Sequence, residues 1–337
     1  MKKIASLLFL FFIIISYAQN VTIISEISRK PLPKVTVFGK NGNILATTDI
    51  EGKFDRSAVE PKQEGYQLVY NNSVIADLNY QDFQKDIIEV NDKTRLIEQV
   101  VMKKSKPAKY IYLHGNFNSY LTINNKLNCY ADGIITCIFD NKTKKLKSSR
   151  VEQYKVYVME EAEEDRKKVA TLVYDNMLDV PKLKNLSRID ELKEKKNLKY
   201  KELSGNNKDE IEFLTEVLQD KEFSLFGYRF FDLKGIISMA FEKSGPKTIK
   251  TFLEYNEIEY TKIKHISESE YNQFIAYSNF YPTELSFENE DAAEKVKFRK
   301  ENSNYSTSYW DQEDFPNMLN VFIGYFGNDM KEMPNKK

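Results

Sequence analysis

The sequence predicts a mainly β or α+β protein, with an N-terminal β-sandwich followed by an antiparallel sheet domain that carries a few helices. Three observations support this prediction. The chain has 337 residues, about twice the ~150 residues that are typical of one domain. Its 21 Tyr and 22 Phe favour sheet over helix. Short apolar runs broken by turn residues recur along much of the chain, as in sandwiches and meanders.

The composition excludes several classes of function. Fifty basic residues balance fifty acidic ones, so no overall field attracts nucleic acid. Only two His and two Cys are present, which excludes His-rich metal sites, zinc ribbons, iron–sulfur clusters and disulfide scaffolds. We therefore expect no metal, no cofactor and no nucleic-acid partner.

Residues 1–18 are predicted to be a secretory signal peptide. Two lysines precede an apolar run from Ile4 to Ile15, and Ser16 and Ala18 are the small residues expected before a cut at Gln19. The alternative is a membrane anchor, but the run is shorter than the ~20 apolar residues of a bilayer span. No Cys stands at the cut, so a lipoprotein-type acyl anchor is excluded. The sequence thus predicts export, to the periplasm or the inner face of the outer membrane, and no transmembrane segment in the mature chain.

Residues 19–103 are predicted to form the sandwich. Asn41-Gly42 favours a type I′ hairpin turn, because both of its central residues need a positive φ. The predicted strands are Val21–Ile27, Lys34–Phe38, Ile44–Thr48, Lys53–Asp55, Tyr66–Tyr70, Val74–Leu78, Ile87–Val90 and Ile97–Met102.

Three strings in this region, Lys30–Val37, Thr48–Phe54 and Leu96–Val101, resemble the carboxypeptidase regulatory-like domain. The resemblance covers about a quarter of the chain and implies a seven-stranded, transthyretin-like sandwich. It implies no activity, since in carboxypeptidases this module is an accessory to a separate catalytic domain. Similar modules lie on the periplasmic side of TonB-dependent outer-membrane receptors.

Asp49, Glu51 and Gly52 allow two interpretations. They are similar to part of an Asp-x-Asp-Gly cation loop, but they offer only two acidic side chains and no bidentate Glu. We favour a tight turn that Asp49 caps and in which Gly52 takes the positive φ.

Residues 104–337 are predicted to form the α+β domain of unknown function, after a basic linker at 103–107. The region of Gly115, Phe117, Tyr120, Tyr130 and Gly133 resembles the part that follows the regulatory-like module in uncharacterised cell-envelope proteins, and that resemblance implies no activity. The predicted strands are Tyr110–Leu113, Phe117–Ile123, Lys126–Tyr130, Ile134–Phe139, Phe223–Phe231, Ile236–Phe241, Ile249–Tyr255, Ile258–His265, Tyr281–Phe287, Lys295–Phe298 and Tyr305–Trp310, with a turn at Asn124-Asn125.

Three helices are expected in this domain. One lies within 182–203, and its interleaved lysines and glutamates indicate a solvated face rather than a membrane surface. The second is marked by Ile211, Leu214, Val217 and Leu218. The third is an apolar stripe within 318–326, which we interpret as a helix docked on the sheet, with a lid or a membrane contact as the alternatives.

A search for catalytic groups yields weak candidates. His265 and Glu268 match the His-x-x-Glu half of a carboxypeptidase zinc site, but the second His that such a site needs downstream is absent. His114 has no acidic residue at a useful spacing, so we interpret both histidines as structural. No Gly-x-Ser-x-Gly elbow, P-loop or dinucleotide fingerprint is present. A pair of catalytic carboxylates among the fifty acidic residues is left open.

Cys129 and Cys137 lie in apolar strands, where a raised thiol pKa makes them poor nucleophiles. A hairpin turn at Asp132-Gly133 would bring the two thiols within reach of a strained disulfide. On one continuous strand they would be ~26 Å apart, too far to bond. The sequence leaves both arrangements open.

These observations predict an exported cell-envelope protein that is not an enzyme and that binds or supports something else, with an envelope protein or an apolar or sugar ligand as partner. They predict no catalytic, cofactor-binding or metal-binding residues. Two alternatives remain: an envelope hydrolase with an accessory regulatory-like domain, marked by carboxylates of perturbed pKa, or a carrier with an apolar cavity for a lipid.

Overall fold

The computed structural model divides into two compact units, residues 1–95 with 319–323 and residues 96–318 with 324–337. We describe each unit by itself. The structure describes residues 20–39, 44–49, 51–59, 61, 65–70, 73–92, 101–102, 108–159, 178–196, 198–204, 208–216, 222–287, 296–312, 315 and 330–336. The signal-peptide residues 1–18, the turn Asn41-Gly42, the linker 103–107 and the expected helix at 318–326 lie outside these ranges.

The first unit is a seven-stranded β-sandwich, as predicted. Its sheets have the orders β4-β1-β7 and β3-β2-β5-β6. Side chains from both sheets, among them Val21, Phe54, Val37 and Leu68, share one apolar core. The elements are β1 (Asn20–Ser25), β2 (Thr36–Gly39), β3 (Ile44–Thr47), β4 (Lys53–Asp55), η1 (Arg56–Ala58), β5 (Tyr66–Tyr70), β6 (Ser73–Leu78), η2 (Tyr80–Gln84) and β7 (Ile87–Val90).

The loop at Asp49 is a capped turn. Asp49 Oδ1 accepts hydrogen bonds from the backbone N–H groups of Glu51 at 2.8 Å and Lys53 at 2.9 Å. Gly52 has a φ of +71°, and a Cβ there would lie 2.8 Å from the Cβ of Pro31. This geometry agrees with the turn interpretation, in which Asp49 serves the backbone and glycine is required at position 52.

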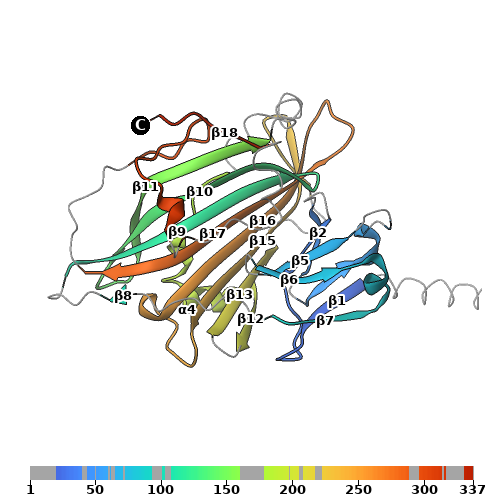
Figure 1. Ribbon diagram of the computed structural model, residues 1–337, viewed down its shortest axis with the longest axis horizontal. Helices are drawn as coiled ribbons and strands as arrows, with labels where there is room; N and C mark the ends of the chain where they lie inside the picture. The colour runs from blue at the N-terminus through green and yellow to red at the C-terminus, as the bar shows by residue number, and fades with distance from the viewer. Residues whose placement is uncertain are drawn as a thin grey trace, which may run out of the picture. The chain divides into compact units, whose positions relative to one another are not determined.

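The second unit is built on an 11-stranded sheet with the path β12-β13-β15-β16-β17-β9-β10-β11-β18, on which β14 pairs with β15 and β8 with β17 (Figure 1). All neighbours along the path are antiparallel. The strands are β8 (Val101–Met102), β9 (Tyr110–Ile123), β10 (Lys126–Asp140), β11 (Leu146–Met159), β12 (Leu198–Ser204), β13 (Lys208–Glu216), β14 (Glu222–Leu225), β15 (Tyr228–Glu242), β16 (Phe252–His265), β17 (Asn272–Ser286) and β18 (Met330–Glu332). The short helices are η3 (Leu183–Asn185), α4 (Ile189–Lys193), η4 (Ile249–Thr251) and η5 (Tyr309–Asp311).

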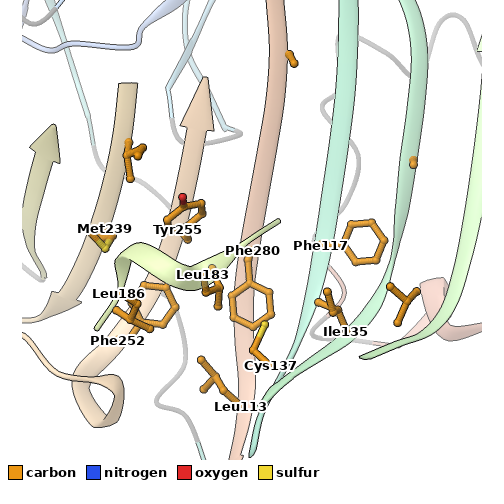
Figure 2. Packing of buried hydrophobic residues seen from close by; sticks show 14 of the residues in the cluster. Leu113, Phe117, Ile135, Cys137, Leu183, Leu186, Met239, Phe252, Tyr255 and Phe280 are labelled. Atoms are coloured by element: carbon orange, nitrogen blue, oxygen red, sulfur yellow. The ribbon is translucent and has the colours of Figure 1, made fainter. Parts of the chain in front are cut away.

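One face of this sheet carries the main apolar core. Figure 2 shows Phe117, Phe252 and Phe280 on neighbouring strands, with Leu183 and Leu186 of the helical segment close to Phe280 and Phe252. Those two leucines are 0% and 3% exposed. The prediction of an antiparallel sheet is therefore confirmed for the part of the chain that the structure describes. The helices are not all on one side of it, because η3 and α4 pack on the core face while Tyr309 of η5 contacts Asp132 on the opposite face.

Two helix predictions are corrected. The helix expected within 182–203 is short: among the described residues of this range only α4 and the single turn η3 are helical, and Leu198–Ser204 is strand β12. Of the helix expected at 211–218, residues 211–216 belong to strand β13, in which Ile211 and Phe213 face the core, and Val217 and Leu218 lie outside the described residues. Spacings of three and four residues suggested a helix, but pairing with β12 and β15 on both sides imposes a period of two.

Several strand boundaries are also corrected. Val101–Met102, expected as the end of the sandwich, pairs with β17 in the large sheet. Residues 223–231 form a hairpin, β14 and β15, with a two-residue turn at Phe226-Gly227. The expected strands at 295–298 and 305–310 are replaced by a single bridge at Val296 and by η5.

Asp132-Gly133 is not a turn, because both residues lie inside the continuous strand β10. Gly133 serves a close approach instead: a Cβ there would lie 2.2 Å from the carbonyl oxygen of Gln153 on β11. The turn at Asn124-Asn125 is confirmed, with φ values of 50° and 67°.

The packing of the helical segment predicts the effect of a core truncation. Leu183→Ala removes a fully buried side chain that lies over the sheet. We expect it to lower the free energy of unfolding of the second unit by about 2–5 kcal/mol, measured by urea denaturation. Lys184→Ala changes an exposed neighbour and serves as the control. Equal stability of the two variants would contradict this packing.

Candidate functional site

The two histidines lie on different strands and do not meet. His265 ends β16, where its Nδ1 is 2.6 Å from the hydroxyl of Ser267 and its ring packs against Tyr228. The Glu268 carboxylate accepts the backbone N–H of His265 at 2.9 Å, so this Glu closes the turn. Among the described residues, no group of three or more His, Cys, Asp and Glu is placed to hold a metal ion.

His114 has an acidic partner that the sequence did not reveal. Its Nδ1 is 2.8 Å from the Thr136 hydroxyl on β10, and that hydroxyl donates to Glu152 on β11. Burial opposes ionisation of Glu152, but hydrogen bonds from His114 and Thr136 lower its pKa. The hydroxyl stands between imidazole and carboxylate, which is not the order of a nucleophile, base and acid in hydrolases. The partner is visible only once β9, β10 and β11 are paired.

The two cysteines lie on the core face of the same strand, β10, and no disulfide joins them. The continuous strand excludes the hairpin arrangement that a disulfide would need. Burial raises the pKa of Cys137 to about 12, as expected for an inert core thiol.

A row of polar side chains crosses the sheet on the face opposite the apolar core. Each member is paired in register with the next, and each is at most 9% exposed. Direct contacts join some of them, such as Asn279 Nδ2, which donates to Asn118 Oδ1 at 2.7 Å. The members, from β13 to β11, are Glu212, Ser238, Asn256, Asn279, Asn118, Asp132 and Lys155.

Asp132 is a buried acid of this row with a shifted pKa. Burial raises its pKa to about 6, and the hydrogen bond from Tyr309 Oη, 2.6 Å from its Oδ1, opposes that shift only in part. Lys155 Nζ lies 3.6 Å from the ring centroid of Trp310, a close cation–π contact. Glu257 also has a pKa raised by burial, but it lies on the core face. These two acids are therefore on opposite faces and do not form a catalytic pair.

Three neighbouring hairpin turns meet at one end of the large sheet, which we call the hairpin end. They are Phe226-Gly227, residues 266–271 and Asn124-Asn125. Antiparallel pairing of β14 to β17 and of β9 with β10 places all three at the same end.

An open cleft of about 500 Å³ lies at the hairpin end. Four of its lining residues form one cross-strand row, Glu222, Phe231, Lys262 and Gln273, from four successive strands. The others are Asn124, Glu270 and Tyr271.

The cleft combines aromatic walls with hydrogen-bonding groups. The Tyr271 hydroxyl donates to Glu222, and the rings of Tyr271 and Phe231 are 5.9 Å apart. Lys262 Nζ is 3.6 Å from Asp232 Oδ2 and lies over the Phe231 ring at 5.7 Å. Such a lining offers apolar faces together with donors and acceptors to a small ligand.

Beside the cleft, the hairpin end exposes large apolar side chains. Phe226 is 83% exposed and Ile266 is 63% exposed, and the N–H of Ile266 donates to the Gly227 carbonyl at 2.9 Å. Phe223 and Leu225 on β14 are 48% and 44% exposed. Neither the cleft nor this apolar surface was predicted, because both depend on which turns the sheet brings together.

The carrier hypothesis required an apolar cavity between the sheet and the C-terminal helix. Residues 318–326 lie outside the described part of the chain, so this arrangement stays a prediction. Within the described residues, Leu183, Leu186 and Ile189 occupy the core face of the sheet. In the part of the chain that the structure describes, no helix is long and apolar enough to span a bilayer.

Comparison with known proteins gives no family. No family model matches the chain, and no curated protein matches it. Among solved structures, one titled "Lipid-protein interactions in lipovitellin" is similar in part, with a TM-score of 0.30 and 7% identity. The match covers 64% of this chain and 28% of that chain, and nothing about function follows from it.

The raised pKa of Asp132 predicts a pH dependence of stability. The folded state holds the proton more tightly than the unfolded state, so stability should fall as the pH rises from about 4 to about 6. The difference of about two pKa units corresponds to on the order of 3 kcal/mol. Asp132→Asn should remove this loss, so its stability relative to the native protein should increase between pH 4 and pH 7 in urea denaturation.

Asp140→Asn provides a control of opposite sign. Hydrogen bonds from Thr143 lower the pKa of Asp140, so its ionised form is favoured in the folded state. This variant should lose stability relative to the native protein as the pH rises through the acidic range to about 4, and its difference from the native protein should then stay nearly constant up to pH 7. A constant difference between Asp132→Asn and the native protein would show that Asp132 titrates normally.

Proposed function

We propose that the protein is exported to the cell envelope and acts there by binding, without catalysis, with the hairpin-end cleft as its ligand site and a saccharide as the ligand class. Export is supported by the charged, apolar and small-residue pattern of residues 1–18. The accessory character of the regulatory-like module, to which residues 19–103 are similar, supports a binding role.

The cleft lining is the observation that carries the ligand class. A sugar ring presents C–H faces that pack on aromatic rings, and hydroxyl groups that pair with amides and carboxylates. Phe231 and Tyr271 provide the rings, while Gln273, Glu222 and Asn124 provide the polar partners. The lining carries charges of both signs, one lysine (Lys262) and two glutamates (Glu222 and Glu270), so a strongly anionic ligand is not favoured.

Export predicts a processed N-terminus. Edman sequencing of the protein isolated from the cell envelope should begin at Gln19, or should be blocked if that glutamine has cyclised. A sequence that begins at Met1 would contradict export through a cleaved signal peptide.

Saccharide binding predicts the effect of cleft substitutions. Calorimetric titration with oligomers of N-acetylglucosamine and of glucose should show binding of at least one of them. Gln273→Ala removes a hydrogen-bonding side chain from the lining and should weaken that binding roughly three- to tenfold. Phe231→Leu should weaken it too, because it removes a ring face.

The matched control is Gln67→Ala. Gln67 is a cross-strand glutamine of the sandwich that donates to Asp77 at 2.9 Å. This variant should bind like the native protein. If neither oligomer series binds, or if all three variants bind alike, the cleft is not a saccharide site.

A further inference from the structure

The turn at Phe226 joins that of Ile266 to form an exposed apolar surface, which we call the apolar apex: Leu225, Phe226 and Ile266. Their side chains are 44%, 83% and 63% exposed. The two turns are neighbours, since the N–H of Ile266 donates to the carbonyl of Gly227. Three large apolar residues thus gather at the tips of adjacent hairpins, an arrangement typical of an interaction surface.

Phe226 is unfavourable for the fold at this position. The turn is of type I′, with φ values of 49° at Phe226 and 81° at Gly227. A bulky aromatic residue rarely adopts a positive φ, and Asn or Gly is the usual occupant. The β9–β10 turn of the same sheet follows that rule with Asn124-Asn125. Backbone conformation therefore favours Asn over Phe at position 226.

Basic side chains stand directly behind the apex. Arg229 of β15 is paired in register with Lys264 of β16, which places two cations opposite each other on the same face. Arg229 is 45% exposed and has Glu222 at 3.5 Å, and the Lys264 ammonium donates to the carbonyl of Ser269. The Glu268 carboxylate is held by the backbone of His265, within its own turn. We call Arg229 and Lys264 the basic collar.

We propose that the apolar apex inserts into the interface of a lipid bilayer, with the basic collar against the lipid phosphates. The apolar side chains at the tips of the two turns would lie at the acyl boundary. Arg229 and Lys264, the second residue pair from the turns, would lie in the headgroup layer. A bilayer offers an apolar layer for the apex and phosphates for the collar, and it needs no pocket of matching shape. None of the three apex residues lines the cleft, so the apex does not depend on the ligand bound there. The collar does touch the cleft lining, since Arg229 lies 3.5 Å from Glu222 and Lys264 Nζ lies 4.6 Å from the centroid of the Tyr271 ring.

The decisive variant is Phe226→Asn. It replaces the strained phenylalanine by the residue that the turn favours, so the melting temperature should be equal to or above that of the native protein. Co-sedimentation with vesicles of phosphatidylethanolamine and phosphatidylglycerol should show binding of the native protein. The variant's partition coefficient should be roughly ten- to a hundredfold lower, because a large apolar contact is lost. Reduced binding at unreduced stability cannot be attributed to misfolding.

Two controls complete the test. Ile87→Asn changes an apolar residue that is 53% exposed in the sandwich, and it should leave vesicle binding unchanged. Phe226→Asn and Ile87→Asn have the same N-terminal segment as the native protein, so any vesicle binding by that segment is equal in all three proteins. Arg229→Gln should weaken binding to these vesicles more than binding to vesicles of phosphatidylcholine alone, because only the former are anionic.

Three results would overturn the proposal. The first is that the native protein does not bind vesicles of either composition. The second is that Phe226→Asn binds them as well as the native protein does. The third is a dimer in analytical ultracentrifugation that Phe226→Asn dissociates, since the apex would then be an interface between two copies of the chain.

Discussion

The architecture of the second unit depends on one constraint: side chains alternate between two faces along strands of 14 and 15 residues that are paired in fixed register. Phe117 and Asn118, Phe280 and Asn279 are neighbours in sequence that lie on opposite faces. A slip of one residue in one strand would move its phenylalanine to the polar face and its asparagine to the apolar one. The apolar core and the buried polar row are therefore two consequences of the same register, and neither forms without the other.

The same register assembles the hairpin end. Glu222, Phe231, Lys262 and Gln273 are distant in sequence, yet successive pairings place them in one row. Their order is set by strand pairing, and Lys262 also contacts the Phe231 ring. The apolar core reaches this row, because Phe274, the residue after Gln273 on β17, packs in the same core as Phe241 and Phe252.

Local signals predicted part of this structure. The seven strands of the sandwich and the turn at Asn124-Asn125 were predicted because each depends on a short run and the turn residues beside it. The helix at 211–218 was wrong because Ile211 and Leu214 fit a helical period, whereas pairing on both sides selected Ile211 and Phe213. The partners of His114 and Asp132 were not predictable from one sequence, because they come from other strands or from a loop far along the chain. The cleft was missed for the same reason.

Two turns of the same type in one sheet separate the demands of folding from those of function. Both connect antiparallel strands through two residues of positive φ, so both turns require the same backbone conformation of their residues. One turn has Asn124-Asn125, residues that readily adopt a positive φ. The other has Phe226-Gly227, in which the strained aromatic residue is 83% exposed to water. The exposed ring adds strain to the turn and is not buried by the fold. We therefore attribute Phe226 to the proposed contact with a bilayer, a contact that the neighbouring exposed Ile266 would share.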